Sequence, residues 1–257
     1  MKLFDSHLHL TDDAFAEDRA EVLARARESG VCAMVTVASN PEDARAGLTL
    51  ARSEPDVWST AGLHPHEARD WAPALMDEIR SLALETDVVA IGETGLDFYY
   101  DNSPRVEQTT SFEAHLALAA ELGLPAIVHS RSADGETADL IRSWAGRLTG
   151  VLHCFSGGRD LLDVGLDAGW YVSFSGIVTF RTYEDADLVR RVPLERLLVE
   201  TDSPYLAPVP RRGRRNEPAF VEHTCRVVAE HRGESAEVVA AATFRNACAL
   251  YRVSEGK

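Results

Sequence analysis

The most regular feature of the sequence is an alternation of short apolar runs with longer stretches of helical spacing. The apolar runs are rich in Val and Ile and are flanked by Gly, Pro, Ser or Asp, which is typical of parallel strands buried on both faces. We expect eight such strands, at residues 3–8, 31–38, 57–63, 88–91, 125–128, 151–153, 170–174 and 197–199. We expect helices at residues 15–28, 41–52, 104–122, 133–147, 159–168, 185–191, 217–231 and 236–250.

Eight strand-and-helix units in a chain of 257 residues predict an α/β fold of the (β/α)8 TIM-barrel type. A doubly wound sheet is the alternative. It would normally have fewer strands, and no glycine-rich fingerprint follows the first apolar run here. No linker, repeat or low-complexity segment divides the chain, so we expect one barrel domain over residues 1–257.

Residues that can bind a metal recur where the predicted strands end. In a TIM barrel this C-terminal rim carries the chemistry, and a buried charge there is costly unless it is paired or bound to a metal. His7 and His9 are two positions apart on a strand, so both imidazoles face the same side. The complete set at the strand ends is His7, His9, His64, Glu93, His129, His153 and Asp202.

The number of these residues predicts a site for two ions. Without His64 there are still six nitrogen and oxygen ligands, which is more than one tetrahedral zinc needs. They fit two divalent ions about 3.5–4 Å apart, the spacing of two-metal hydrolases. Glu93 is the available bridge, because the only lysines are Lys2 and Lys257 and no internal lysine can be carboxylated.

Composition narrows the possible functions further. The lack of an internal lysine excludes a P-loop and argues against Schiff-base chemistry. The net charge of −15 argues against tight nonspecific binding of duplex DNA. Four widely separated cysteines indicate reduced thiols, and neither a signal peptide nor a membrane span is expected. We therefore expect a cytoplasmic protein.

The motifs at the strand ends resemble those of the TatD-type metal-dependent deoxyribonucleases, and the resemblance covers nearly the whole chain. The motifs that carry it are Asp5-Ser6-His7-Leu8-His9, Gly62-Leu63-His64-Pro65-His66, Gly92-Glu93-Thr94-Gly95-Leu96-Asp97-Phe98-Tyr99, His129-Ser130-Arg131, His153-Cys154-Phe155-Ser156-Gly157, Glu200-Thr201-Asp202-Ser203-Pro204-Tyr205-Leu206, Arg212-Gly213 and Asn216-Glu217-Pro218. Each motif alone is modest, but their order and spacing together are highly specific.

The resemblance implies a barrel that hydrolyses phosphodiester bonds in DNA, often by exonucleolytic trimming, with two divalent ions. By analogy with the family, one ion is held by His7, His9 and Asp202, the other by His129 and His153, and Glu93 bridges them. The identity of the metal stays open between Mg, Mn and Zn. The chain departs from the usual family pattern at Ser132 and at residues 211–215, and these departures affect the fit of the substrate rather than the ligands.

Several residues at the same rim are candidates for catalysis and substrate binding. Asp202 and Glu93 are the expected catalytic carboxylates, with Asp202 as the base that takes the proton of the attacking water. His64 either contacts a phosphate or the leaving group, or caps a loop. Glu200 either supports the ligands or packs in the barrel interior.

The candidates for substrate binding each have a structural alternative. Arg131 either grips a phosphate or holds its loop, and Tyr99 either stacks on a base or packs in the core. Arg212 lies in a run of four arginines among residues 211–215, which is either a phosphate site or a solvated loop. We expect weak, salt-sensitive binding of DNA strand ends, and the sequence is silent about protein partners.

Two other functions share part of this pattern. A hydrolase of small amides, esters or lactones on the same barrel would also have the two histidines of the first strand, although the Glu93 bridge favours the nuclease. A scaffold without catalysis is the third possibility, but buried ligands without a metal would destabilise it.

Overall fold

The computed structural model describes residues 1–254, so Lys257 and the end of the predicted domain lie outside the described part. Its strands pair in the order β1 to β8 in one sheet, and every neighbouring pair is parallel. The strands are β1 (Leu3–Leu8), β2 (Val31–Thr36), β3 (Val57–Ala61), β4 (Val88–Asp97), β5 (Ala126–Arg131), β6 (Gly150–Leu152), β7 (Tyr171–Phe174) and β8 (Leu197–Val199).

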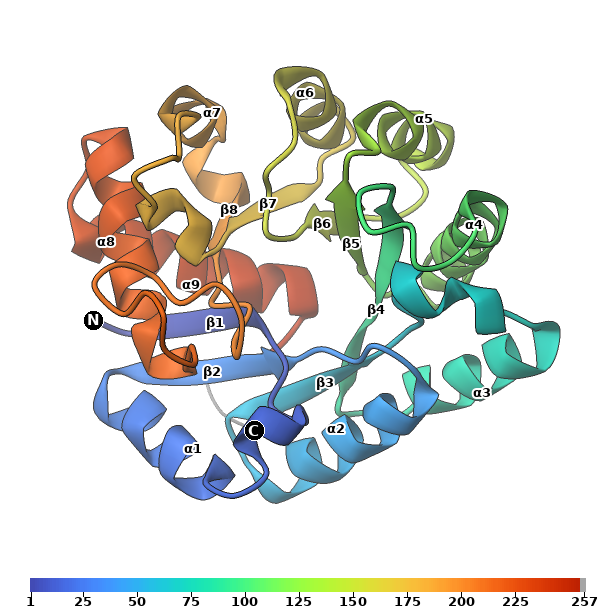
Figure 1. Ribbon diagram of the computed structural model, residues 1–257, viewed down its shortest axis with the longest axis horizontal. Coiled ribbons are helices and arrows are strands. Elements are labelled where there is room, and N and C mark those ends of the chain that lie inside the picture. The colour runs from blue at the N-terminus through green and yellow to red at the C-terminus, as the bar shows by residue number, and fades with distance from the viewer. Residues whose placement is uncertain (255–257) are drawn as a thin grey trace.

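Helices surround the sheet, which curls into a barrel (Figure 1). They are α1 (Arg19–Glu28), α2 (Pro41–Ser53), α3 (Pro73–Ala83), α4 (Arg105–Leu122), α5 (Asp134–Trp144), α6 (Arg159–Asp167), α7 (Ala186–Arg191), α8 (Val221–Arg232) and α9 (Ala236–Tyr251). The start of α2 shows why the sequence forms a helix there: Pro41 occupies its first turn, and the Asn40 side chain accepts a hydrogen bond from Asp43 N. The predicted (β/α)8 fold is confirmed.

Backbone hydrogen bonds join the segment after β8 to β1 and complete the ring. Asp202 N donates to His7 O at 2.9 Å, and His9 N donates to Ser203 O at 2.8 Å. These bonds place the side chains of two distant sequence motifs at one rim.

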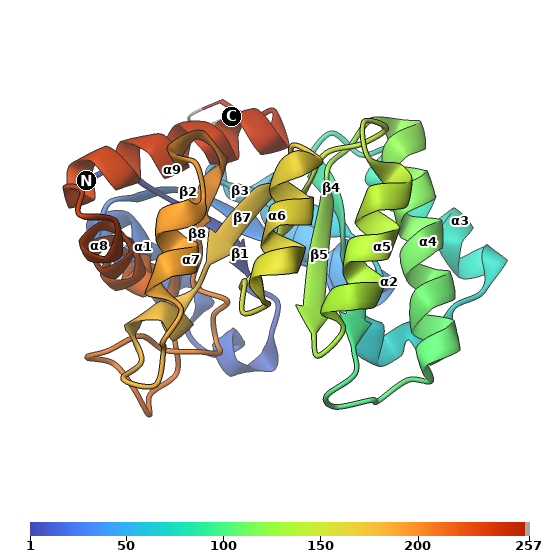
Figure 2. The same cartoon turned by 90° about the horizontal axis from the view of Figure 1, so that it is seen from above.

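The core has two parts. The larger cluster of apolar side chains fills the layer between the barrel and its helices, with Trp170, Phe112 and Phe174 among the fully buried ones. A second cluster inside the barrel includes Phe4 and is covered by Leu250 and Tyr251 of α9. Helix α9 therefore closes the end of the barrel away from the strand C-termini (Figure 2). Among residues 1–254, no helix combines the length and apolar character that crossing a membrane requires.

Two elements differ from the sequence-based expectation. Strand β4 continues past Ile91 to Asp97, because Gly92 and Gly95 lie within the strand instead of ending it. Helix α3 is not among the expected helices, although Pro73 begins it and Ile79 and Ala83 are buried on one face. The extension of β4 matters for function because it carries Glu93 and Asp97 on the same strand.

Candidate metal centre

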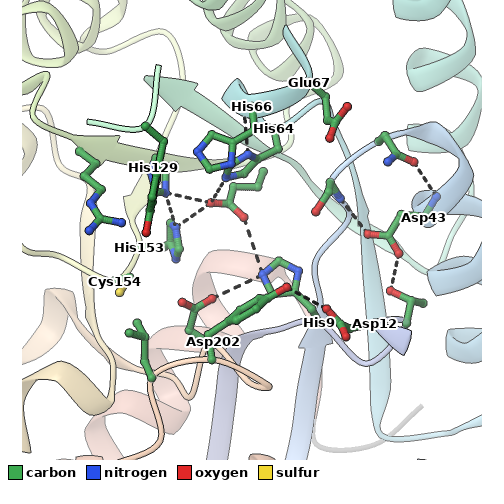
Figure 3. Close-up of a pocket in the computed structure, with 18 of the residues that line it drawn as sticks. His9, Asp12, Asp43, His64, His66, Glu67, His129, His153, Cys154 and Asp202 are labelled. Carbon is green, nitrogen blue, oxygen red and sulfur yellow. Dashed lines mark hydrogen bonds and ion pairs between the residues drawn. The ribbon is translucent and has the colours of Figure 1, made fainter. Parts of the chain in front are cut away.

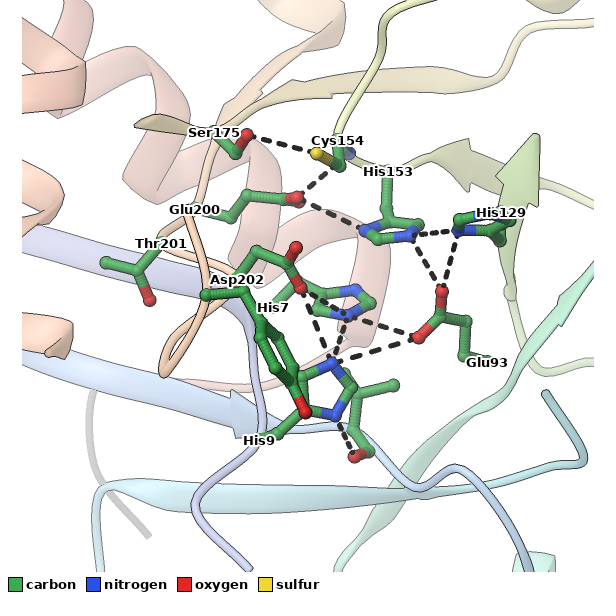
Figure 4. Close-up of polar contacts among 12 residues, drawn as sticks. His7, His9, Glu93, His129, His153, Cys154, Ser175, Glu200, Thr201 and Asp202 are labelled. Atoms are coloured by element: carbon green, nitrogen blue, oxygen red, sulfur yellow. Dashed lines mark hydrogen bonds and ion pairs between the residues drawn. The ribbon is translucent and has the colours of Figure 1, made fainter. Parts of the chain in front are cut away.

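Glu93 lies between two pairs of histidines and turns one carboxylate oxygen toward each pair (Figure 4). Its Oε2 atom is 3.4 Å from His7 Nε2 and 3.9 Å from His9 Nε2. Its Oε1 atom is 3.2 Å from His129 Nδ1 and 2.8 Å from His153 Nε2. This is the arrangement that a carboxylate shared between two cations requires.

Asp202 completes the half of the cluster that contains His7 and His9. Its Oδ1 atom lies 3.4 Å from His9 Nε2 and 3.7 Å from His7 Nε2. The structure thus brings all six predicted ligands together, four around one point and three around another, with Glu93 in both groups. The side chain of Asp202 is 14% exposed and that of Glu93 only 3%, so solvent reaches the Asp202 carboxylate more easily.

The outer ring nitrogens show which inner nitrogens can bind a cation. His9 Nδ1 lies 3.0 Å from Val37 O and His153 Nδ1 lies 3.2 Å from Glu200 Oε1, so both donate outward. His129 Nε2 lies 3.1 Å from Asp97 Oδ2 and also donates. In a neutral ring the inner nitrogen then has a free lone pair, which is the form that ligates a metal.

The spacing of these donors fits a bound ion in each half. Ligands about 2.1 Å from one ion and about 90–110° apart lie about 3.0–3.4 Å from each other. His7 Nε2 and His9 Nε2 are 3.3 Å apart, and His129 Nδ1 and His153 Nε2 are 3.4 Å apart. Lone pairs held this close repel unless a cation lies between them. The donor set therefore suits divalent metal ions.

Protons compete for the same donors. Burial alone would raise the pKa of Glu93, but the surrounding imidazoles, that of His153 foremost, bring it well below its ordinary range. Burial would lower the pKa of His9, yet the Asp202 carboxylate beside it raises the pKa to about 9. A cation that binds here must displace protons, so its affinity falls as the pH is lowered.

His64 makes different contacts from the four histidines of the cluster. Its Nδ1 atom accepts a hydrogen bond from His66 N at 3.1 Å, which leaves the proton on Nε2. That Nε2 lies 3.4 Å from Glu93 Oε1. Burial lowers the pKa of His64 to about 4, so the ring is neutral at pH 7. His64 is thus placed as a hydrogen-bond donor toward the centre of the site.

The cluster opens into a cleft of about 1120 Å³ (Figure 3). One side of it is acidic, with lining residues Asp12, Asp13, Glu42, Asp43 and Glu67. Among the described residues that line the cleft, the only arginine or lysine is Arg131, which lies on the side of His129. This division of charge gives an anionic substrate one favourable side of approach.

Of the predicted substrate-binding residues, Arg131 lines the cleft, whereas Tyr99 and Arg212 do not. The guanidinium carbon of Arg131 lies 4.4 Å from the centre of the Tyr99 ring and 4.7 Å from that of Tyr100. Tyr100 itself lines the cleft. Arg212 stacks on Phe180, 3.8 Å from the ring centre.

Comparison with known proteins identifies the family. The model of the family described as TatD related DNase matches residues 4–252. This chain belongs to that family. Two relatives named 3′-5′ ssDNA/RNA exonuclease TatD, from Pantoea vagans and Salmonella typhimurium, are each 42% identical over 98% of this chain and 100% and 99% of their own. The crystal structure of YjjV, a TatD homologue from Escherichia coli K12, has a TM-score of 0.92 at 28% identity and covers 98% of both chains. The expected family and enzyme class, a nuclease, are confirmed.

Two further carboxylates of this TatD family member contact the outer ring nitrogens of candidate ligands, Glu200 at His153 and Asp97 at His129. Glu200 is fully buried, and besides His153 it accepts a hydrogen bond from Cys154 N at 2.8 Å. Its contact with His153 places it as a support for the cluster. Asp97 holds His129, and the sequence analysis did not single it out. A signal was present, because Glu93 and Asp97 are four residues apart on one strand and therefore share a face.

Proposed function

We propose that this TatD family member is a single-domain, divalent-metal-dependent exonuclease that removes nucleotides from DNA strand ends with two bound ions. The observation that carries the proposal is the position of Glu93, which offers one oxygen to each of two histidine pairs. His7, His9 and Asp202 would hold one ion, and His129 and His153 the other. Two ions supply the positive charge that polarises a phosphoryl oxygen and lowers the pKa of water.

The chain's own residues would handle the protons of the reaction. Asp202, the more exposed of the two central carboxylates, takes the proton of the attacking water. His64, neutral with its proton on Nε2, donates a hydrogen bond to a phosphoryl or leaving oxygen. Glu93 contacts both histidine pairs and so fixes the distance between the two halves of the site.

The charges around the cleft support a substrate held at its end. Arg131 can pair with a phosphate, and the neighbouring rings of Tyr99 and Tyr100 can stack on an unpaired base. Arg212, on the exposed loop after β8, would meet the strand farther from the cleft. The acidic side of the cleft and the net charge of −15 oppose a long contact with a duplex, so binding is weak and salt-sensitive.

The relatives named as ssDNA/RNA exonucleases support single strands as the form of the substrate, and RNA as a second substrate to test. The cytoplasm is the proposed location, which the free thiols of Cys32, Cys154 and Cys225 support.

The test is digestion of single-stranded oligonucleotides, labelled at the 5′ or the 3′ end, with Mg²⁺, Mn²⁺ or Zn²⁺. We expect EDTA to abolish cleavage, one of the ions to restore it, and Glu93→Gln to remain inactive. Asp160→Asn is the matched control, because Asp160 is an exposed carboxylate on the first turn of α6. Cleavage that survives exhaustive metal removal would refute the proposal. Hydrolysis of small esters or amides without any cleavage of DNA or RNA would favour the other class of barrel hydrolase.

A further inference from the structure

The two carboxylate oxygens of Asp97 have different hydrogen-bond partners. Its Oδ1 atom accepts hydrogen bonds from Tyr99 N at 3.0 Å and Tyr100 N at 2.9 Å. Its Oδ2 atom lies 2.9 Å from His66 Nε2 and 3.1 Å from His129 Nε2. One buried residue therefore contacts both the turn that carries Tyr99 and Tyr100 and the candidate metal ligand His129.

The position of Asp97 is fixed from behind. Its side chain is 1% exposed. Its backbone N donates to Gln108 Oε1 at 2.8 Å, and Gln108 Nε2 donates to Asp97 O at 3.2 Å and to Ser103 O at 2.8 Å. Gln108 holds the backbone of Asp97, and four donors hold its carboxylate. The carboxylate therefore cannot turn without breaking several hydrogen bonds.

We propose that Asp97 is a positioning residue that keeps the proton of His129 on Nε2 and so leaves the Nδ1 lone pair facing the metal centre. An ionised carboxylate only accepts hydrogen bonds, so the nitrogen that faces Oδ2 must carry a proton. In neutral His129 the other nitrogen, Nδ1, is then unprotonated. It lies 3.2 Å from Glu93 Oε1 and 3.4 Å from His153 Nε2. The inference rests on the proposed function, in which His129 binds an ion.

The division of labour predicts an unusual result for Asp97→Asn. Two backbone N–H groups point at the Oδ1 position, so the asparagine must keep its oxygen there. Its amide nitrogen then occupies the Oδ2 position and donates toward His129 Nε2. His129 has to accept on Nε2, and its proton moves to Nδ1, where it blocks the ion. The nearly isosteric variant thus reverses the tautomer and leaves the turn of Tyr99 and Tyr100 in place.

Asp97→Ala provides the contrast. It removes the acceptor for the backbone N–H groups of Tyr99 and Tyr100, but it places no donor against His129. If Asp97 served only to hold the turn, alanine would be the more damaging change and asparagine nearly neutral. If it sets the tautomer, asparagine is the more damaging change for metal binding, although it is the milder one for substrate affinity.

The experiment measures metal binding and the tautomer separately. Mn²⁺ is titrated into wild-type protein, Asp97→Asn, Asp97→Ala and the Asp160→Asn control, and free Mn²⁺ is followed by electron paramagnetic resonance. We expect one of the two sites to weaken about 10–100-fold in Asp97→Asn, the loss typical of removing an orienting partner, with the control unchanged. Nitrogen NMR of the histidines in metal-free protein, at a pH high enough that His129 is neutral, should show its proton on Nε2 in wild type and on Nδ1 in Asp97→Asn.

Two results would overturn the inference. One is Asp97→Asn binding both Mn²⁺ ions with wild-type affinity. The other is metal-free wild-type protein in which neutral His129 carries its proton on Nδ1, which decides the matter even if the variant does not fold. If wild-type protein binds no Mn²⁺, Mg²⁺ or Zn²⁺, the proposed function fails instead, and the tautomer measurement still tests Asp97.

Discussion

Acidification is expected to destabilise this protein through His115, a histidine far in sequence from the motifs of the cluster. His115 lies on α4 and is fully buried. Its Nε2 atom accepts a hydrogen bond from Leu63 N at 3.0 Å, and its Nδ1 atom donates to Ser111 O at 2.7 Å. The neutral ring thus accepts the hydrogen bond of the backbone N–H of Leu63, the residue before His64. A protonated ring has no lone pair and could not accept this bond.

The size of the effect follows from the change in pKa. Burial lowers the pKa of His115 from 6.5 to about 4, with the hydrogen bond to Ser111 O acting in the opposite direction. Because the folded pKa lies below the unfolded one, the unfolded chain takes up this proton first. The stabilisation is complete above pH 6.5 and is lost as the pH falls toward 4. At about 1.4 kcal/mol for each pH unit, the total is about 3 kcal/mol, a large part of an ordinary stability of about 5–15 kcal/mol.

Urea unfolding of wild-type protein and His115→Gln at pH 7 and pH 4.5 isolates this contribution. Glutamine can accept from Leu63 N and donate to Ser111 O, but it does not titrate. EDTA in every sample removes any effect of metal release, and the other titrating groups are common to both proteins. We expect the free energy of unfolding of wild type to fall by about 2 kcal/mol more than that of the variant. Equal losses in the two proteins would refute the assignment of a depressed pKa to His115.

Three further results are expected. Mn²⁺ at about one hundred times its Kd should stabilise the protein by about 2.7 kcal/mol per site, measured as a rise in Tm that is smaller in Glu93→Gln, and an unchanged Tm would contradict a metal centre. Tyr100→Ala should weaken binding of a single strand by about 1–3 kcal/mol in a fluorescence anisotropy assay, because a base loses its stacking partner. Substituting glutamine for Arg211, Arg212 and Arg214 should lower the slope of log Kd against log salt by about 2 if all three contact phosphates, whereas an unchanged slope would make this a solvated loop.

Much of the fold could be predicted because the barrel repeats one simple pattern. The eight apolar runs stand where the structure has strands, since a parallel strand buried on both faces leaves few choices of residue. Strand β4 could not be delimited in this way, because glycine ordinarily signals a turn. A Cβ atom on Gly95 would lie 2.0 Å from His129 O, so glycine is required there for β4 and β5 to approach each other. A glycine that ordinarily signals a turn is thus the residue that lets His129 come close.

Helix α3 carries a helical pattern that the expected elements left out. Its apolar side chains recur at helical spacing, at Leu75, Met76, Ile79, Leu82 and Ala83. Ile79 and Ala83 are buried, and the other three are partly buried and pack against the core. Pro73 also marks its first turn, where proline favours the start of a helix. This helix could therefore have been predicted from the sequence.

The roles of the histidines depend on contacts that a pattern of residues cannot contain. His64 and His129 both follow or end a strand of the barrel, and both lie within 3.4 Å of Glu93 Oε1. What separates them is the partner of the outer nitrogen. His64 accepts a backbone hydrogen bond there and must present N–H to the site, whereas His129 donates to Asp97 and can present a lone pair. We therefore propose His64 as a donor and His129 as a ligand. The difference comes from a backbone N–H of the neighbouring turn for His64 and from a carboxylate of the adjacent strand for His129.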